Sequence, residues 1–148
     1  MKHLIRLGVG LALAAVLLNT TAIAWAQTVD VYKLGNCGCC AKWVDHLRSN
    51  GFTPRVHDIQ DLDPIKQKLG VPKELTACHT AQVDGYVIEG HVPADLIHKF
   101  LKERPRKALG LAVPAMPAGS PGMEGTHKVD YEVLLIKADG GYVTYAKR

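Results

Sequence analysis

The sequence has little net charge, few cysteines and a single long apolar run. Across 148 residues the formal charge is +4, and setting aside Lys2 and Arg6 of an expected leader lowers it to +2. So small a balance argues against nucleic acid or a membrane surface as the main partner. Four cysteines are too few for a small secreted domain held together by disulfides. No internal repeat or long low-complexity tract divides the chain, which fits one domain with one modest core.

The N-terminal segment is typical of an export signal. Lys2 and Arg6 precede an apolar run over residues 7–18, and Ala24-Trp25-Ala26 supplies an A-x-A cleavage site. The run is short of the roughly 20 residues that a transmembrane helix needs, although an uncleaved anchor is the alternative. Without a twin arginine, we expect export of the unfolded chain and metal uptake afterwards. We predict a signal peptide over 1–26 and a periplasmic single domain over 27–148.

Hydrophobic periodicity predicts alternating strands and helices in the first part of the mature chain. Residues 29–34 and 52–59 are typical of strands, and residues 39–49 and 63–69 of helices. Residues 80–83 and 86–89 flank Asp84-Gly85, which is a strong hairpin signal. Pro93 then begins a helix with an apolar face.

The remaining residues differ in composition. Residues 105–125 are rich in proline, glycine and alanine and predict an ordered loop or a flap, and residues 129–136 and 142–145 predict a closing β-hairpin. The full order predicts an α/β (α+β) fold. We expect a thioredoxin-like mixed sheet flanked by helices, with a C-terminal methionine-containing loop before the hairpin.

Three cysteines occur in one run, Cys37-Gly38-Cys39-Cys40, at the first strand-to-helix junction. A helix N-terminus stabilises thiolate, because its backbone N–H groups and its dipole favour negative charge. Cys37 and Cys40 have the C-x-x-C spacing of a redox-active disulfide, whereas a Cys39–Cys40 disulfide would be strained. Three thiolates at one helix end repel one another unless a cation compensates. The run therefore predicts metal binding or thiol redox chemistry.

The other soft side chains favour copper. Thiolate and thioether select Cu(I), although zinc and iron–sulfur clusters also accept thiolates. Met116 and Met123 lie in the proline- and glycine-rich segment, and zinc would have little use for them. Cys78-His79 precedes a strand, where a thioredoxin-like fold brings a loop against the cysteine helix. His91 precedes a helix and is a candidate ligand, while the role of His79 stays open. The other mature-chain histidines carry no functional signal: His46, His57, His98 and His127.

Several motifs together resemble the periplasmic CopG copper-resistance proteins, a thioredoxin-like family. The matching segments cover nearly the whole mature chain: Asn36-Cys37-Gly38-Cys39-Cys40, Ala77-Cys78-His79-Thr80, residues 84–93 (DGYVIEGHVP), residues 110–114 (GLAVP) with Met116, and Gly119-Ser120-Pro121-Gly122-Met123. The resemblance implies copper held by the C-x-C-C thiolates, with a multinuclear copper cluster as one form of the site. It also implies a role in copper tolerance through interconversion of Cu(I) and Cu(II). It implies Cys37, Cys39, Cys40 and Cys78 as core ligands. Because His91, Met116 and Met123 fall within the matching motifs, the resemblance implies them as further ligands.

The expected cofactor is thus copper, and the expected partners are copper ions and other periplasmic copper-handling proteins. No nucleic acid is expected, and no membrane after signal cleavage. One alternative is a thiol–disulfide oxidoreductase acting on proteins, in which Cys37 attacks and Cys40 resolves, but it leaves Cys39 and the methionines without a role. A passive copper store or chaperone is another. An iron–sulfur ferredoxin is a fourth reading, for which unfolded export makes cluster loading awkward.

Overall fold

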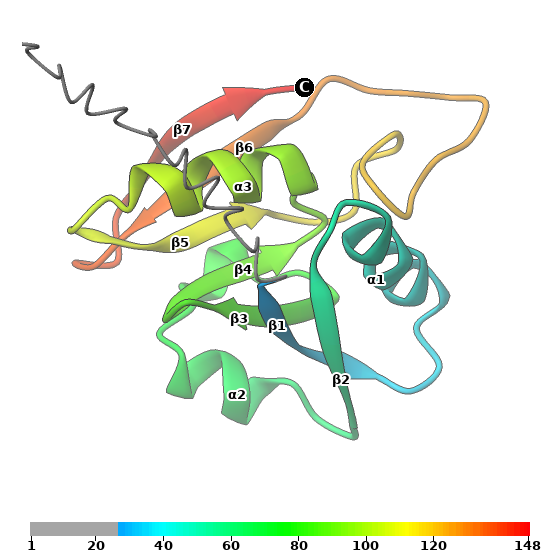
Figure 1. Ribbon diagram of the computed structural model, residues 1–148, viewed down its shortest axis with the longest axis horizontal. Coiled ribbons are helices and arrows are strands. Elements are labelled where there is room, and N and C mark those ends of the chain that lie inside the picture. Colours follow the sequence, from blue (N-terminus) through cyan, green and yellow to red (C-terminus); the bar gives the residue numbers. More distant parts are fainter. Residues whose placement is uncertain (1–26) are drawn as a thin grey trace, which may run out of the picture.

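The structure is a computed structural model that describes residues 27–148; the predicted signal peptide, 1–26, lies outside the described residues. Its centre is a seven-stranded mixed sheet with the order β2-β1-β3-β4-β5-β6-β7 (Figure 1). The strands are β1 (Thr28–Leu34), β2 (Thr53–Ile59), β3 (His79–Val83), β4 (Tyr86–Gly90), β5 (Ala108–Val113), β6 (Glu132–Lys137) and β7 (Tyr142–Lys147). The pairs β1–β2 and β4–β5 are parallel and the other neighbours are antiparallel.

The helices are α1 (Gly38–Ser49), α2 (Asp63–Lys68) and α3 (Ala94–Glu103), with a short 3₁₀ turn η1 (Lys73–Leu75). The apolar faces of α1 and α3 pack on one side of the sheet, where Trp43 and Phe100 are fully buried against strand residues such as Ile88. A smaller cluster of Leu75, Ala112 and Ile136 forms with η1. Among residues 27–148 no helix is long and apolar enough to cross a membrane.

The predicted order of elements is confirmed as far as α3. The Asp84-Gly85 turn has positive φ at both residues, 49° and 82°, which matches the twist of a two-residue hairpin. The mixed sheet with flanking helices, the methionine-containing loop and the closing hairpin β6–β7 are confirmed as well. The narrower comparison with thioredoxin remains a prediction, as does the division of the chain at residue 26.

One part of the prediction was wrong. Residues 108–113 were expected to belong to a loop or flap, but they form β5, between β4 and β6. This strand contains small residues that give a weak strand signal, and it is buried on both faces, so no apolar–polar alternation marks it. Gly110 lies directly against the backbone of Val87 in β4, where a side chain has no room.

Candidate metal centre

Cysteine sulfurs gather at the N-terminus of α1, as the sequence predicted for its C-x-C-C run. Cys37 is the N-cap residue of the helix, and the backbone N–H of Cys40 donates to its Sγ at 3.3 Å. Cys37 and Cys40 form a disulfide, and Cys40 is fully buried. Cys39 and Cys78 are free thiols of intermediate exposure. The Sγ of Cys39 lies 3.6 Å from that of Cys37.

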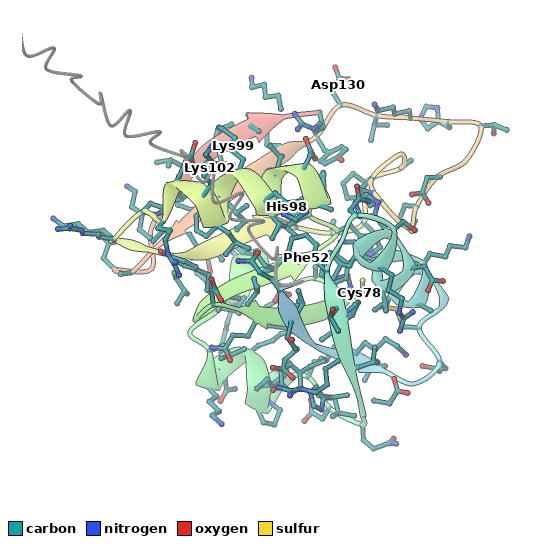
Figure 2. All side chains as sticks on the ribbon, viewed as in Figure 1. Phe52, Cys78, His98, Lys99, Lys102 and Asp130 are labelled. Atoms are coloured by element: carbon teal, nitrogen blue, oxygen red, sulfur yellow. A yellow bond between two sulfur atoms is a disulfide. The ribbon has the colours of Figure 1, made fainter. Side chains whose placement is uncertain are left out.

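The loop between η1 and β3 brings the fourth cysteine to the same place, beside α1 (Figure 2). The Sγ of Cys40 lies 3.6 Å from the backbone carbonyl oxygen of Cys78. The four cysteine sulfurs lie within 4.8 Å of one another, so a single ion or a small cluster could bridge them. A groove of about 390 Å³ opens onto Cys37 and Cys78 from the side of α2.

The methionine-containing loop contributes one thioether to this group. The thiol of Cys39 points to the Sδ of Met116 at 3.9 Å, and Met116 is 47% exposed. The side chain of Met123 is partly buried, and among the described residues its thioether makes no hydrogen bond to a cysteine. The two methionines, which the sequence treats alike, therefore occupy different positions in the structure.

Gly122 sets the docking of this loop on α1. Its φ is +90°, and a Cβ built on it would lie 2.6 Å from the carbonyl oxygen of Cys39 and 3.0 Å from the backbone nitrogen of Trp43. Only glycine allows so close an approach in this backbone conformation. The preceding residue, Pro121, places its carbonyl oxygen 2.7 Å from Nδ1 of His91.

Two imidazoles lie on the other side of Cys78. Nε2 of His91 is 3.0 Å from the Sγ of Cys78, and Nδ1 of His79 is 3.4 Å from it. Because Nδ1 of His91 donates to the Pro121 carbonyl, its Nε2 carries the lone pair that faces the sulfur. Cys78, His79 and His91 form a second group within 4.8 Å, so Cys78 belongs to both groups.

Burial sets the protonation of these groups in the metal-free protein. It raises the pKa of the Cys78 thiol to about 12, with the nearby Cys39 adding to the effect. Burial lowers the pKa of His79 to about 3, and it also lowers the pKa of His91. At neutral pH both imidazoles are therefore neutral and able to bind a metal, whereas Cys78 must lose a proton to do so.

The donor set fits copper. Sulfur donors match Cu(I), and the neutral imidazoles also suit Cu(II). His79 faces the sulfur of Cys78 with Nδ1, whereas its fully buried Nε2 has no hydrogen-bond partner in the described structure. A buried polar atom without a partner costs about 1–3 kcal/mol. An ion beside Cys78 would bind Nδ1 and leave this cost unchanged. The ring packs on the indole of Trp43, with centroids 4.3 Å apart.

A buried polar network lies directly behind the Cys78 loop. Nζ of Lys66 is 2.6 Å from Oε1 of Glu89 and 2.8 Å from Oγ1 of Thr80, and all three side chains are buried. The backbone N–H of Ala77 donates to the same carboxylate. No sequence pattern predicted this network, and none assigned a role to His79. Their only sequence signals were the adjacency of His79 to Cys78 and the position of Glu89 two residues before His91.

One of the histidines without a functional signal has a structural role. Nε2 of His46 on α1 accepts the backbone N–H of Ala94 at the start of α3, and burial lowers its pKa. His57 pairs with Asp30, and His98 packs on Phe52.

Comparison with known proteins supplies three findings. The sequence model of a family described as a protein of unknown function, DUF411, matches residues 75–123, which hold Cys78, His79, His91 and both loop methionines. Two solved structures of a copper resistance protein, CopG, are each 40% identical to the chain and cover 84% of it. Form 2 matches over 99% of its own length with a TM-score of 0.79, and form 1 over 98% with 0.78. Among curated proteins, none matches.

Proposed function

The chain belongs to the CopG family of copper resistance proteins, and on this basis we propose that it is an exported copper resistance protein that binds Cu(I) through its four cysteine sulfurs. The observation that carries the proposal is the meeting of sulfurs from two distant segments, the α1 N-terminus and the Cys78 loop, within 4.8 Å. The helix dipole and the backbone N–H groups at the α1 N-terminus favour thiolate there. Cu(I) neutralises the charge that crowded thiolates build up.

The residues around the sulfurs extend the proposed site. Met116 adds a thioether beside Cys39, which favours Cu(I) over zinc. His91 and His79 face Cys78 from the opposite side and enlarge the site toward a multinuclear arrangement in which the Cys78 sulfur is shared. Met123 is the weakest of the ligands that the sequence suggested, because no hydrogen bond links its thioether to a cysteine among residues 27–148.

The disulfide couples copper binding to redox chemistry. In the oxidised protein Cys37 and Cys40 are bonded to each other, so two of the four sulfurs cannot act as thiolate ligands. When two Cu(II) ions are reduced, each takes one electron from the Cys37–Cys40 dithiol, the S–S bond forms and two protons leave. Cu(I) oxidation by the disulfide is the reverse step. Copper is the substrate and cargo of this exchange, which makes the protein a copper–thiol oxidoreductase.

The predicted signal peptide supports a periplasmic location for this chemistry. An oxidising compartment favours the Cys37–Cys40 disulfide, so loading of Cu(I) onto all four sulfurs there needs a thiol reductant that opens the disulfide.

Cu(I) titration of the reduced mature protein tests the proposal. We expect more than one Cu(I) per chain by metal analysis, fewer in Cys39→Ser, and fewer again in the oxidised wild type. Serine keeps the size of the side chain and removes one sulfur. An unchanged copper number in Cys39→Ser, or equal loading of the oxidised and reduced proteins, would contradict a thiolate site built on the C-x-C-C run.

A second candidate function is thiol–disulfide exchange with protein substrates. The groove that opens onto Cys37 and Cys78 favours it, because an incoming thiol could reach the Cys37–Cys40 disulfide there. Rapid reduction of insulin by the metal-free protein would support this function over the copper one. A passive copper store differs from the oxidoreductase in one observable: its bound copper keeps one oxidation state while the thiols are titrated.

A further inference from the structure

Glu89 holds both ends of the loop that carries Cys78. Its Oε1 accepts the backbone N–H of Ala77 at 2.6 Å, and its Oε2 accepts the hydroxyl of Thr80 at 2.7 Å. These two residues immediately flank Cys78 and His79. Lys66 on α2 donates to Oε1 of Glu89 at 2.6 Å and to the Thr80 hydroxyl at 2.8 Å. One carboxylate, fully buried, thus ties helix α2 to both sides of the Cys78 loop.

The same residue connects this loop to His91. Glu89 belongs to β4, which ends at Gly90 directly before His91. Gly90 has a φ of +69°, and a Cβ on it would lie 2.6 Å from Cβ of Ala77, so β4 and the Cys78 loop pack at close range. The relative position of the Cys78 sulfur and the His91 ring therefore depends on the contacts that Glu89 makes.

Stability alone is a poor explanation for this arrangement. A buried ion pair loses so much hydration that apolar residues of similar volume often replace it without loss of stability. Residues 76–78 lie outside any helix or strand, so the backbone N–H of Ala77 has no ladder partner and bonds to Glu89 instead. Groups behind a metal ligand that fix its orientation are worth about 10- to 100-fold in metal affinity.

We propose that Glu89, with Lys66 as its counter-ion, is the positioning residue that holds Cys78 at bridging distance from the C-x-C-C sulfurs. This inference rests on the proposed copper-binding function and assigns to Glu89 and Lys66 a role in it. Neither residue belongs to the two groups of candidate ligands: they act through the backbone of Ala77 and the hydroxyl of Thr80, and so through the loop between them.

Two double variants separate the positioning role from the loss of charge. Lys66→Met with Glu89→Leu removes both charges, leaves no unpaired buried ion and cannot hold the loop. Lys66→Met with Glu89→Gln removes the same charges, but the amide can accept the Ala77 N–H and donate to the Thr80 hydroxyl. The two variants differ only at residue 89, and thermal unfolding tests whether each is folded.

Two measurements are made on each protein. The first is the affinity of the reduced protein for Cu(I), against a competing chelator. The second is the alkylation rate of Cys78 in the oxidised, metal-free protein, where Cys39 is the other free thiol and serves as internal reference. We expect the leucine variant to bind Cu(I) about 10- to 100-fold more weakly than the glutamine variant. Its Cys78 should also react faster relative to Cys39.

Equal values in the two double variants would overturn the proposal. If the leucine variant does not fold, Thr80→Val decides, because it keeps the side-chain shape and removes one of the two ties to Glu89. It should shift both measurements in the same direction by a smaller amount, and unchanged values would overturn the proposal. Failure of the reduced wild type to bind Cu(I) would instead refute the proposed function, while the alkylation rates still decide whether Glu89 positions Cys78.

Discussion

Gly122→Ala should detach the methionine-containing loop from α1. The new Cβ would lie 2.6 Å from the carbonyl oxygen of Cys39, 3.0 Å from the backbone nitrogen of Trp43 and 3.4 Å from Nδ1 of His91. The first of these distances is shorter than real Cβ contacts allow, and its partner is backbone in the first turn of α1. The loop must therefore move away from the helix, and Pro121, which accepts the hydrogen bond of His91, must move with it.

The expected loss of stability has two parts. An alanine at φ +90° adopts a left-handed conformation that costs about 1–2 kcal/mol. Overpacking against fixed backbone adds about 1–3 kcal/mol. The free energy of unfolding should then fall by about 2–5 kcal/mol, a large part of the 5–15 kcal/mol that is usual for a domain.

Two further glycines supply matched controls. Gly140 has a φ of +86° and nothing within 4 Å of its Cβ position, so Gly140→Ala measures the backbone term without a clash. Gly125 has open space as well and no positive φ, so Gly125→Ala should change little. The difference between Gly122→Ala and Gly140→Ala isolates the contact between the loop and α1.

Urea unfolding followed by tryptophan fluorescence measures the free energy of unfolding of the three glycine variants, because Trp43 is the only tryptophan after residue 26 and is fully buried. We also expect Cu(I) affinity to fall in Gly122→Ala, since the loop carries Met116 and orients His91. If Gly122→Ala matched Gly140→Ala within about 0.5 kcal/mol, the resolution expected for independent substitutions, the loop would not be held by this contact.

Three further predictions concern single side chains. Met116→Leu should weaken Cu(I) binding more than Met123→Leu, with stability unchanged, because the Met116 thioether lies 3.9 Å from the Cys39 sulfur, whereas among residues 27–148 no hydrogen bond joins Met123 to a cysteine. Chelator competition compares the two variants. Hydrogen bonds from Arg55 and His57 on β2 lower the pKa of Asp30 to about 2. The Asp30 carboxylate therefore stabilises the folded protein fully above pH 4, and this contribution is lost as the pH falls toward 2. Acid unfolding should show Asp30→Asn less stable at pH 6 by about 1 kcal/mol after solvent screening, with the gap closing at pH 2. The pKa of His46 is lowered by burial, so stability should fall as the pH drops below 6.5, and His46→Gln, which keeps an acceptor for α3, should flatten that dependence.

The sequence predicted the parts of the fold that depend on local patterns. Strand alternation, the Asp84-Gly85 turn and the apolar face of α3 can each be recognised from a few neighbouring residues, and each is confirmed. The strand β5 was missed because its place inside the sheet depends on its neighbours β4 and β6. Neither neighbour is adjacent to it in the sequence, so no local pattern reveals the pairing. Its own residues carry no alternation that would reveal it.

In the candidate site, too, the sequence predicted the features that depend on local patterns and missed those that depend on distant contacts. The position of Cys37 at a helix N-terminus follows from the local pattern, and so does the C-x-x-C pairing with Cys40. The difference between Met116 and Met123 does not, because it depends on how Gly122 seats the loop on α1. Sequence reasoning also could not find the pair of Lys66 and Glu89, since they lie 23 residues apart and meet only through the packing of α2 behind the sheet.

The shared position of Cys78 gives the proposed redox exchange a physical basis. When the Cys37–Cys40 disulfide is closed, Cys78, His79 and His91 still offer one sulfur and two neutral imidazoles, a set that accepts Cu(II). When the disulfide is reduced, the same Cys78 sulfur joins three more, a set that favours Cu(I). The Cys78 sulfur can therefore act as a ligand in both thiol states. When the Cys37–Cys40 dithiol reduces Cu(II), closure of the disulfide removes two sulfurs from the set that favours Cu(I). The Cu(I) that forms should then be held more weakly, so disulfide formation and copper transfer should occur together.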